Sequence, residues 1–214
     1  GAAIARTLAP LDAWRKRGVE VIVVDGTSED DTVQQATPLA SRLVVVSAGR
    51  ARQLNAGAAL AESQHLLFLH ADTIAPNDAD LILCSSIYQS NNLMAWGRFN
   101  VRIEGQSRWL TVIAFMMNWR SRITGIATGD QGIFMTRAAF DAVGGFADQP
   151  LMEDIEISQR LRRLSRPICL SQKVTTSGRR WETRGVWRTV MLMWSLRWRY
   201  WRGESAASLA KDYR

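Results

Sequence analysis

The sequence of 214 residues has few cysteines and no long apolar run, and each shortage excludes a class of protein. Only Cys84 and Cys169 are present, with no CxxC spacing, so neither a disulfide framework nor a cysteine zinc site is expected. This usage favours a reducing compartment, and in their apolar surroundings we expect both thiols to be buried structural groups. Because no stretch reaches about 18 uninterrupted apolar residues, we predict no transmembrane helix.

What is present suits a folded α/β domain of ordinary size. Hydrophobic residues make up 47% of the chain and charged residues 22%, which allows a sizeable core and excludes a disordered chain. The length suits one domain with an appended element. We expect a catalytic-type domain over residues 1–176 and a basic, tryptophan-rich helical element over residues 177–214.

The positive charge is concentrated near the C-terminus. Residues 177–202 contain seven arginines and one acid, Glu182, so they supply most of the net charge of +7. Five of the nine tryptophans lie in the same segment. This mixture favours contact with a membrane surface or a polyanion. The alternative is a helix that packs its tryptophans on the core and leaves its arginines in solvent.

Short strands alternate with helices in the first part of the chain. We predict helices over 2–17, 30–40 and 49–61, and strands over 19–24, 43–47 and 65–69. This alternation predicts a mostly parallel central sheet with helices on both faces. Since ligands bind outside the carboxyl ends of such strands, Asp25 and Asp72, which follow two of them, indicate a ligand site.

The second half of the chain is less regular. We predict helices over 76–90, 107–119, 137–143 and 152–164, and strands over 94–103 and 167–174, with residues 129–135 as a segment of unassigned type. The helix over 107–119 carries Trp109, Ile113 and Met116. We expect it to face the core, and contact with an acceptor or a membrane is the alternative.

Three groups of charged residues are candidates for chemistry. Asp72 could ligate a divalent cation on a diphosphate, although a turn cap has the same sequence pattern. Glu153 and Asp154 open a helix, where a carboxylate could act as a general base or only stabilise the helix dipole. Arg50 and Arg52 precede a helix and could bind phosphate or remain a solvated pair.

Several blocks resemble glycosyltransferase family 2 in order and spacing. They are residues 24–32 (VDGTSEDDT), 49–57 (GRARQLNAG), 67–73 (LFLHADT), and 144–146 (GGF) followed by 152–156 (MEDIE). Residues 129–131 (GDQ) and 180–181 (RW) are similar to a short bacterial subgroup of the selenodomain-associated transferase 2 type. Each block alone is weak evidence for the resemblance, but five blocks in the family's order and spacing are strong evidence.

The resemblance implies a GT-A fold, inverting sugar transfer and a Mg²⁺ or Mn²⁺ cofactor. The implied donor is a nucleotide-sugar, a UDP- or GDP-sugar first. On the acceptor side, the resemblance implies Asp154 as general base, Glu153 as the residue that orients the acceptor, and Trp181 as a platform for an acceptor sugar. On the donor side, it implies that Asp25, Arg50 and Arg52 bind the nucleoside, that Asp72 binds metal and diphosphate, and that Arg180 offsets leaving-group charge. Asp130 and Gln131 are implied to line the donor or acceptor side.

The chain departs from the family pattern in ways that bear on these roles. Gly26 replaces the second aspartate of the nucleotide turn, which weakens the case for base recognition there. His70 replaces the first acid of the metal motif, so metal binding rests on Asp72, with His70 as a second candidate ligand. Only Arg180 and Trp181 match the longer motif of processive synthases, so processive synthesis is not expected. The family's first strand is not in the sequence, and we expect it to precede Gly1.

Two rival interpretations remain open. A sugar nucleotidyltransferase would need a glycine-rich phosphate loop near the N-terminus, which we do not find. A non-catalytic protein that binds a membrane surface or nucleic acid would leave the carboxylates of Asp72, Glu153 and Asp154 without a role. We expect no nucleic-acid partner, and we expect a cytoplasmic enzyme, peripheral at the inner membrane face, with a lipid-linked acceptor.

Overall fold

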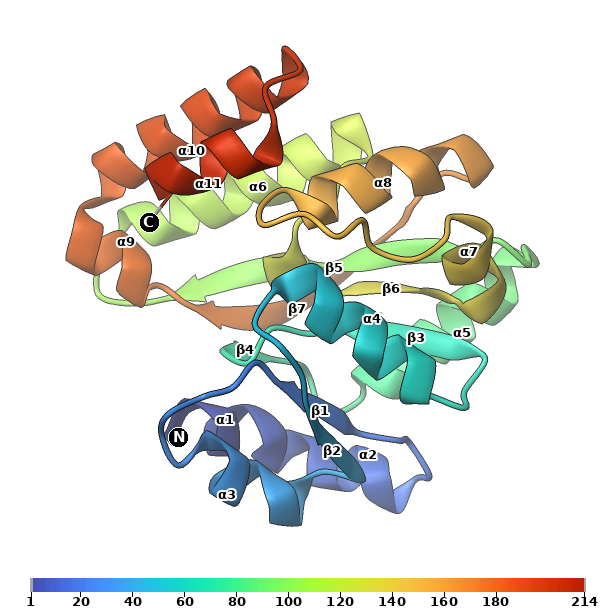
Figure 1. Ribbon diagram of the computed structural model, residues 1–214. Helices are drawn as coiled ribbons and strands as arrows, with labels where there is room; N and C mark the ends of the chain where they lie inside the picture. Colours follow the sequence, from blue (N-terminus) through green and yellow to red (C-terminus); the bar gives the residue numbers. More distant parts are fainter. Residues whose placement is uncertain (1, 214) are drawn as a thin grey trace.

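The computed structural model describes residues 2–213, which form seven strands, eleven α-helices and three short 3₁₀ helices (Figure 1). The strands are β1 Ile22–Asp25, β2 Arg42–Val45, β3 His65–Phe68, β4 Thr73–Ile74, β5 Trp96–Glu104, β6 Ile133–Thr136 and β7 Ile168–Ser177. The helices are α1 Ala2–Leu8, η1 Ala9–Leu11, α2 Asp12–Lys16, α3 Thr32–Ala36, η2 Thr37–Leu39, α4 Arg50–Leu60, α5 Ala79–Ser90, α6 Trp109–Thr124, η3 Gly129–Gln131, α7 Arg137–Ala142, α8 Glu153–Leu164, α9 Arg179–Arg184, α10 Val186–Trp201 and α11 Ala206–Tyr213.

The strands form two sheets of different character. β1 and β2 pair in parallel, and the five-stranded sheet has the order β3-β6-β5-β7-β4. Within it β5 and β7 are parallel, whereas β3 with β6, β5 with β6, and β4 with β7 are antiparallel. The α/β class is therefore confirmed, but the expectation of a mostly parallel sheet is wrong. After α6 the chain turns at Gly125 and passes through η3, so β6 starts opposite Arg98 and runs against β5.

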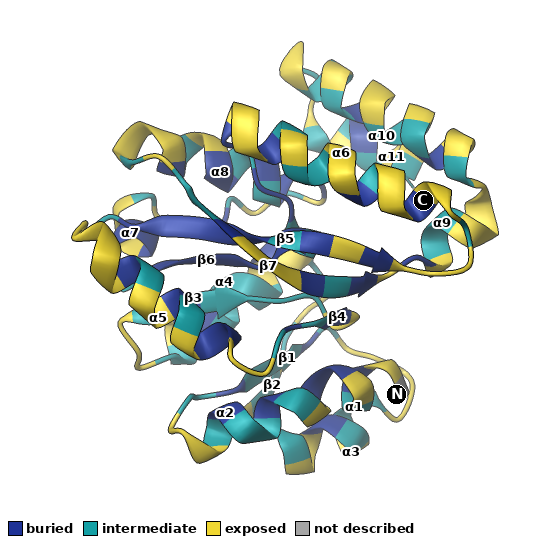
Figure 2. Ribbon diagram, turned by 180° about the vertical axis from the view of Figure 1, so that it is seen from behind, coloured by how far each residue is buried: buried dark blue, intermediate teal, exposed yellow. Residues whose placement is uncertain are grey.

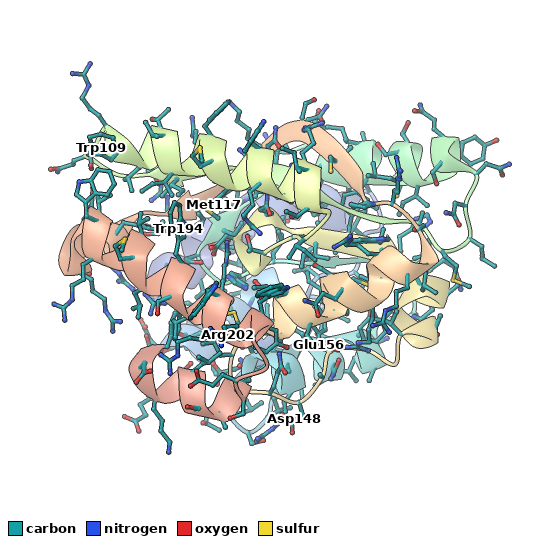
Figure 3. The ribbon with its side chains drawn as sticks, turned by 90° about the horizontal axis from the view of Figure 1, so that it is seen from above. Trp109, Met117, Asp148, Glu156, Trp194 and Arg202 are labelled. Atoms are coloured by element: carbon teal, nitrogen blue, oxygen red, sulfur yellow. The ribbon has the colours of Figure 1, made fainter. Side chains whose placement is uncertain are left out.

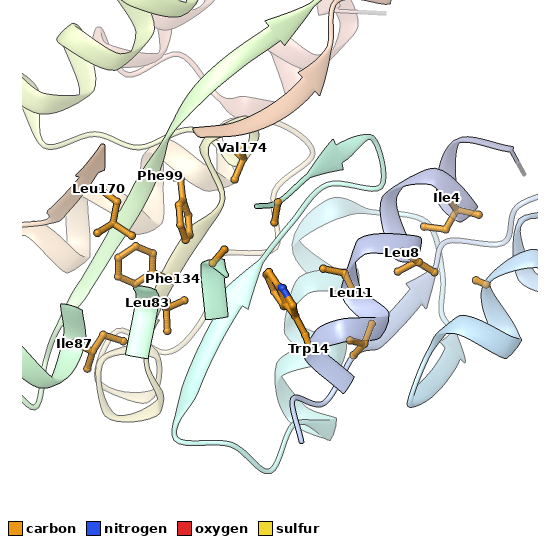
Figure 4. Close-up of a cluster of buried hydrophobic side chains, with 14 of the residues drawn as sticks. Ile4, Leu8, Leu11, Trp14, Leu83, Ile87, Phe99, Phe134, Leu170 and Val174 are labelled. Carbon is orange, nitrogen blue, oxygen red and sulfur yellow. The ribbon is translucent and has the colours of Figure 1, made fainter. Parts of the chain in front are cut away.

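Two buried clusters lie on opposite faces of the larger sheet. One joins the N-terminal helices to α5 and the sheet, with Trp14, Leu83 and Phe99 among its members (Figure 4). The other packs α4, α7 and α8 against the strands around Trp96 and Met135. The predicted helix over 2–17 is divided, because Pro10 cannot donate a helical hydrogen bond and lies in η1. The strand expected to precede Gly1 stays a prediction.

The C-terminal helices α9, α10 and α11 pack on the same side of the large sheet as α6 and α8 (Figure 1). Leu196 of α10 and Leu209 of α11 are fully buried against Leu151, Met152 and Ile155. The helices of the basic element are thus joined to the start of α8 by a shared core. No helix within residues 2–213 is long and apolar enough to cross a membrane.

The outer faces of α6 and α10 are apolar, and for α6 this differs from the expected core-facing helix. Trp109 and Met116 of α6 are exposed, while Leu110, Ala114 and Ser121 form its buried face, so the expectation of a core-facing apolar stripe is wrong for those two residues. On α10, four tryptophans are exposed (Figure 2): Trp187, Trp194, Trp198 and Trp201. Cys84 is also exposed, contrary to expectation, and Cys169 is half-buried.

Candidate functional site

Asp154 stands in the first turn of α8 and is held by backbone donors. Its Oδ2 accepts a hydrogen bond from the Gly129 amide at 2.9 Å, and its Oδ1 accepts one from the Ile155 amide at 2.7 Å. Met152, at the start of the helix, has a φ of 66°, which turns the chain sharply into α8. The side chain is half-buried and its carboxylate is fixed against η3. A fixed, partly accessible carboxylate is the geometry that a general base requires.

Glu153 lies beside Asp154 but in a different environment. Its side chain is only 3% exposed, and the nearest cation is Arg50, whose Nη1 lies 3.8 Å from Glu153 Oε1. Burial, together with the negative charge of Asp154, raises the pKa of Glu153 above its ordinary value. Glu153 and Asp154 are therefore adjacent carboxyl groups with different surroundings, one buried and one half-buried against η3.

His70, which follows β3, pairs with Asp130 of η3. Its Nδ1 lies 3.3 Å from Asp130 Oδ1. Burial opposes the charged imidazole, but the hydrogen bond and charge of Asp130 outweigh it and raise the pKa of His70. Burial likewise opposes ionisation of Asp130, yet His70 lowers the pKa of that carboxyl. The ring also packs tightly on η3, because a Cβ on Gly129 would lie 2.2 Å from His70 Nε2.

A basic pocket of about 540 Å³ lies at the ends of β4 and β7, beside α9 and α11. Among residues 2–213, Asp72 is the only carboxylate that lines it. The other lining residues are Ser177, Arg179, Arg180, Thr183, Arg184 and Tyr213. The Arg180 guanidinium stacks 3.8 Å from the centre of the Tyr213 ring. Arg180 and Arg184 each donate a hydrogen bond to the Tyr213 carbonyl, both at 3.1 Å. Three guanidiniums around one carboxylate make a site suited to a polyanion such as a diphosphate.

Arg50 connects this pocket electrostatically to the carboxylates on α8. Burial opposes its charge, but the charges of Tyr213, Glu153, Asp130 and Asp154 together raise its pKa. Arg50 Nη1 thus lies 3.8 Å from Glu153 Oε1, and the guanidinium also interacts electrostatically with Tyr213, which lines the basic pocket. The structure therefore brings Asp72, Arg50, Asp130, Glu153, Asp154 and Arg180 into one region.

Four of the expected site residues make structural contacts instead of lining this region. Asp25 is buried and accepts from the Ser28 amide at 2.8 Å and from the Ser28 hydroxyl at 2.5 Å, which closes its own turn. Arg52 is exposed and pairs with Asp148 at 3.1 Å. Gln131 is fully buried in a capping box with Thr128, and Trp181 packs with the cluster around Leu110. Their roles in binding stay predictions.

The metal-binding side chains of the described residues suit a divalent cation only when a substrate supplies further ligands. Within residues 2–213 no three His, Cys, Asp or Glu side chains are grouped as a metal site. His70 uses Nδ1 for Asp130 and presses its other edge on Gly129, so it is a poor ligand in this arrangement. Mg²⁺, however, is commonly held by one carboxylate plus substrate phosphates and water. Asp72, facing a pocket suited to phosphate, satisfies that requirement.

Sequence reasoning missed three residues of this region: Arg120, Arg197 and Tyr213. Arg120 lies on α6, Arg197 on α10 and Tyr213 on α11. Charge interactions connect Arg120 and Arg197 with Asp154, and Tyr213 with Arg50. No local motif marks any of them, because they reach the site only through the packing of the C-terminal helices. The one available signal was the unusual arginine content of residues 177–202.

Comparison with solved structures identifies the fold as that of the GT-A glycosyltransferases. A mannosyltransferase from Pyrobaculum calidifontis, in complex with GDP-Man and Mn²⁺, superposes with a TM-score of 0.57 at 18% identity, covering 81% of this chain and 52% of that one. S. aureus TarS in complex with UDP-GlcNAc gives 0.61 at 20% identity, with 81% and 54% covered. Glucosyl-3-phosphoglycerate synthase from Mycobacterium tuberculosis, in complex with phosphoglyceric acid, gives 0.55 at 16%, with 80% and 66% covered.

The family is shown by the sequence as well as by the fold. Residues 1–144 match the model of glycosyl transferase family 2, so the chain belongs to that family. No curated protein matches it. The chain spans between 52% and 66% of the length of these three solved structures, whose identities to it are low. They therefore show its fold, and its donor and acceptor are matters for proposal.

Proposed function

We propose that this chain transfers a sugar from a nucleotide-diphosphate donor to an acceptor hydroxyl with inversion at the anomeric carbon, and that Asp154 is the general base. The observation that carries the proposal is the position of Asp154. Its carboxylate is fixed by the Gly129 amide at 2.9 Å, and Arg50 connects it to the basic pocket that Asp72 lines. One site thus offers a base for the acceptor and a binding place for the leaving group.

The residues divide the reaction between them. Asp154 takes the proton of the acceptor hydroxyl, whose oxygen forms the new bond to the anomeric carbon from the face opposite the diphosphate. The bond from that carbon to the phosphate oxygen breaks, and its electron pair leaves with the nucleoside diphosphate. Arg180 and its neighbours in the pocket stabilise the charge that develops there. Glu153, buried beside Asp154, orients the acceptor.

We assign a divalent cation, Mg²⁺ or Mn²⁺, to Asp72. When bound with the donor, it would neutralise charge on the diphosphate. A Mn²⁺ ion and GDP-Man in one structural neighbour, and UDP-GlcNAc in another, support a metal and a UDP- or GDP-sugar. Asp72 is the one carboxylate that the described part of the chain contributes to the pocket, so metal affinity should depend on the nucleotide being present.

The test is a thermal-shift screen against UDP-, GDP-, CDP- and dTDP-sugars with and without Mn²⁺. One nucleotide should raise the melting temperature, more so with Mn²⁺, and Asp72→Ala should abolish the metal-dependent part. Asp154→Asn should keep the nucleotide shift and lose about 10²–10⁴-fold in transfer rate. Asp148→Asn, an exposed carboxylate paired with Arg52, is the matched control. Absence of any shift in folded protein would contradict the proposal.

We further propose that α6 and α10 together rest on an anionic membrane surface. Eleven of the sixteen exposed large apolar side chains lie on these two helices, and neither helix contains an acid. The helices adjoin, since the rings of Trp109 and Trp187 lie 5.0 Å apart. We call these side chains the apolar face: Trp109, Val112, Phe115, Met116, Trp119, Ile123, Trp187, Met191, Trp194, Trp198 and Trp201.

The charged residues of α6 and α10 are all basic, which favours an anionic lipid surface over a second copy of the chain as the partner of the apolar face. The exposed apolar residues, four tryptophans and Met191, recur along α10 at intervals of three and four residues, which gives one continuous stripe. Basic residues with Trp and Phe on helices that cannot span a bilayer are typical of interfacial binding. Anionic lipid is characteristic of the cytoplasmic leaflet, so the proposal places the chain at the inner membrane face, where a lipid-linked acceptor would be available.

Vesicle sedimentation tests the apolar face. We expect binding to phosphatidylglycerol vesicles at low salt, weaker binding to phosphatidylcholine, and loss of binding in Phe115→Ser/Ile123→Ser and in Trp194→Ser/Trp198→Ser. Tyr88→Ser/Leu93→Ser, which changes two exposed apolar residues elsewhere, is the control. Failure to bind anionic vesicles, or a dimer in solution that the same substitutions dissociate, would overturn the membrane assignment.

A further inference from the structure

Two arginines close to the candidate base have no neutralising partner. The Nε and Nη2 atoms of Arg120 are buried without a hydrogen-bond partner among the described residues. Arg197 is half-buried, and its guanidinium makes no hydrogen bond or ion pair within residues 2–213. An unsatisfied buried cation costs free energy, so its retention calls for a physical reason.

The helices that carry the two arginines, α6 and α10, lie beside α8 on the same side of the large sheet (Figure 3). On α10, Leu196 packs with Met152 and Ile155, the residues around Asp154. On α6, the Asn118 side-chain oxygen accepts from Gln131 Nε2 at 3.3 Å, which fixes α6 on η3. The helix turn bearing Arg120 and the turn bearing Arg197 therefore converge on the part of the chain that holds Asp154.

Electrostatics supports the same arrangement. Burial lowers the pKa of Arg197, while the charges of Asp154 and Asp130 oppose this effect. Burial, followed by the like charge of Arg197, lowers the pKa of Arg120 to about 10, against the influence of Asp154. The two cations thus repel each other, and Asp154 acts on both from beyond ion-pair distance. Its own oxygens are occupied by the Gly129 and Ile155 amides.

This pair of cations is separate from the basic pocket assigned to the donor. That pocket is lined from β4, β7, α9 and α11, and neither Arg120 nor Arg197 belongs to it. Tyr213 of the pocket interacts with Arg50 and not with either of the two arginines. The proposed reaction needs a second substrate next to Asp154, and α10 packs on the residues that flank Asp154.

We propose that Arg120 and Arg197 form an anion subsite for the acceptor, which carries a phosphate or carboxylate close to the hydroxyl that Asp154 deprotonates. The assignment of this anion to the acceptor rests on the proposed function. The anion subsite itself is supported by the unpartnered guanidinium of Arg120 and by the packing of α6 and α10 around the start of α8. Two guanidiniums present planar donors that match such a group. The anion removes the repulsion between them and holds the hydroxyl against the base.

The test measures anion binding without catalysis. Arg180→Gln is used as the background, because it weakens the phosphate affinity of the donor pocket. Inorganic phosphate, at constant ionic strength, should raise the melting temperature saturably. Arg120→Met and Arg197→Met should each weaken this binding at least tenfold. Arg122→Met and Arg188→Met, exposed arginines on the same two helices, should leave it unchanged.

A second readout separates a binding role from a structural one. If no anion is bound, Arg120→Met removes a buried charge that repels Arg197, so it should raise the melting temperature. A structural role would instead lower it. The inference is overturned if phosphate binding survives both Met variants, or if Arg120→Met lowers the melting temperature in phosphate-free buffer.

Two further arms identify the source of the anion and isolate the proposed function. Vesicles containing phosphatidic acid test a lipid-borne phosphate. If Arg120→Met loses binding to these vesicles, the subsite is assigned to such a lipid. If Arg120→Met loses only the binding of inorganic phosphate, the subsite is assigned to a soluble acceptor. Nucleotide binding by the wild-type chain is measured in parallel. If it is absent while phosphate binding still depends on Arg120, the proposed function fails and the anion subsite stands.

Discussion

His70 and Asp130 show how one residue pair can make the site sensitive to pH. The pKa of His70 lies above its ordinary value of 6.5, because the charge and hydrogen bond of Asp130 outweigh burial. A group whose pKa is raised on folding adds stability that is complete below its unfolded pKa. This contribution is lost as pH rises through the folded pKa. The free energy of unfolding should therefore fall as pH increases above 6.5.

Urea unfolding in chelator-containing buffer at pH 6 and pH 8.5 checks this expectation. His70→Gln should lose this part of the pH dependence, and His65→Gln should keep it. His65 is the right control, since it is the only other histidine and lies near Cys84 with no carboxylate partner among the described residues. Equal pH dependence in wild type and His70→Gln would contradict the assignment of a charged pair.

At the scale of elements, the sequence was informative where local chemistry decides the structure. Apolar periodicity and turn glycines placed α4, α5, α7 and α8 and the strands β1, β2 and β3 to within a few residues, and the block around Glu153 and Asp154 was placed at a helix start. The short strand β4 and the division of the C-terminal element into α9, α10 and α11 were not predicted. Strand direction was not predictable, because β6 reverses only through the packing of α6 and η3. Arg120 and Arg197 were not predictable either, since packing alone brings helices so distant in the sequence to Asp154.

The packing of α10 and α11 on α8 leads to a second prediction. Leu209 of α11 is fully buried with Leu151 and Ile155, so Leu209→Ala should lower the free energy of unfolding by about 2–4 kcal/mol. Leu164→Ala removes the same atoms from a side chain that is 41% exposed, and should cost less than about 1 kcal/mol. Urea titrations of both variants give the comparison. Similar small losses would mean that α11 contributes no core.

At the scale of the whole molecule, the question is whether the basic C-terminal element is an independent part. The sequence suggested a division near residue 176, but the packing crosses it twice. Trp181 joins the cluster of Val101, Leu110 and Ala114, and Leu196 joins the cluster at the start of α8. Shared cores of this kind couple unfolding, so residues 2–213 should unfold in one transition.

The distribution of tryptophan makes this prediction testable. Five of the nine tryptophans lie between residues 177 and 202, so fluorescence weights the C-terminal element, whereas far-UV circular dichroism weights all helices. The two urea midpoints should coincide in the wild type and should shift together in Leu209→Ala, because α11 stabilises the same core that positions Asp154. A fluorescence transition that precedes the dichroism transition would show that α9–α11 detach first. The basic pocket and the arginines above Asp154 would then assemble only when those helices dock.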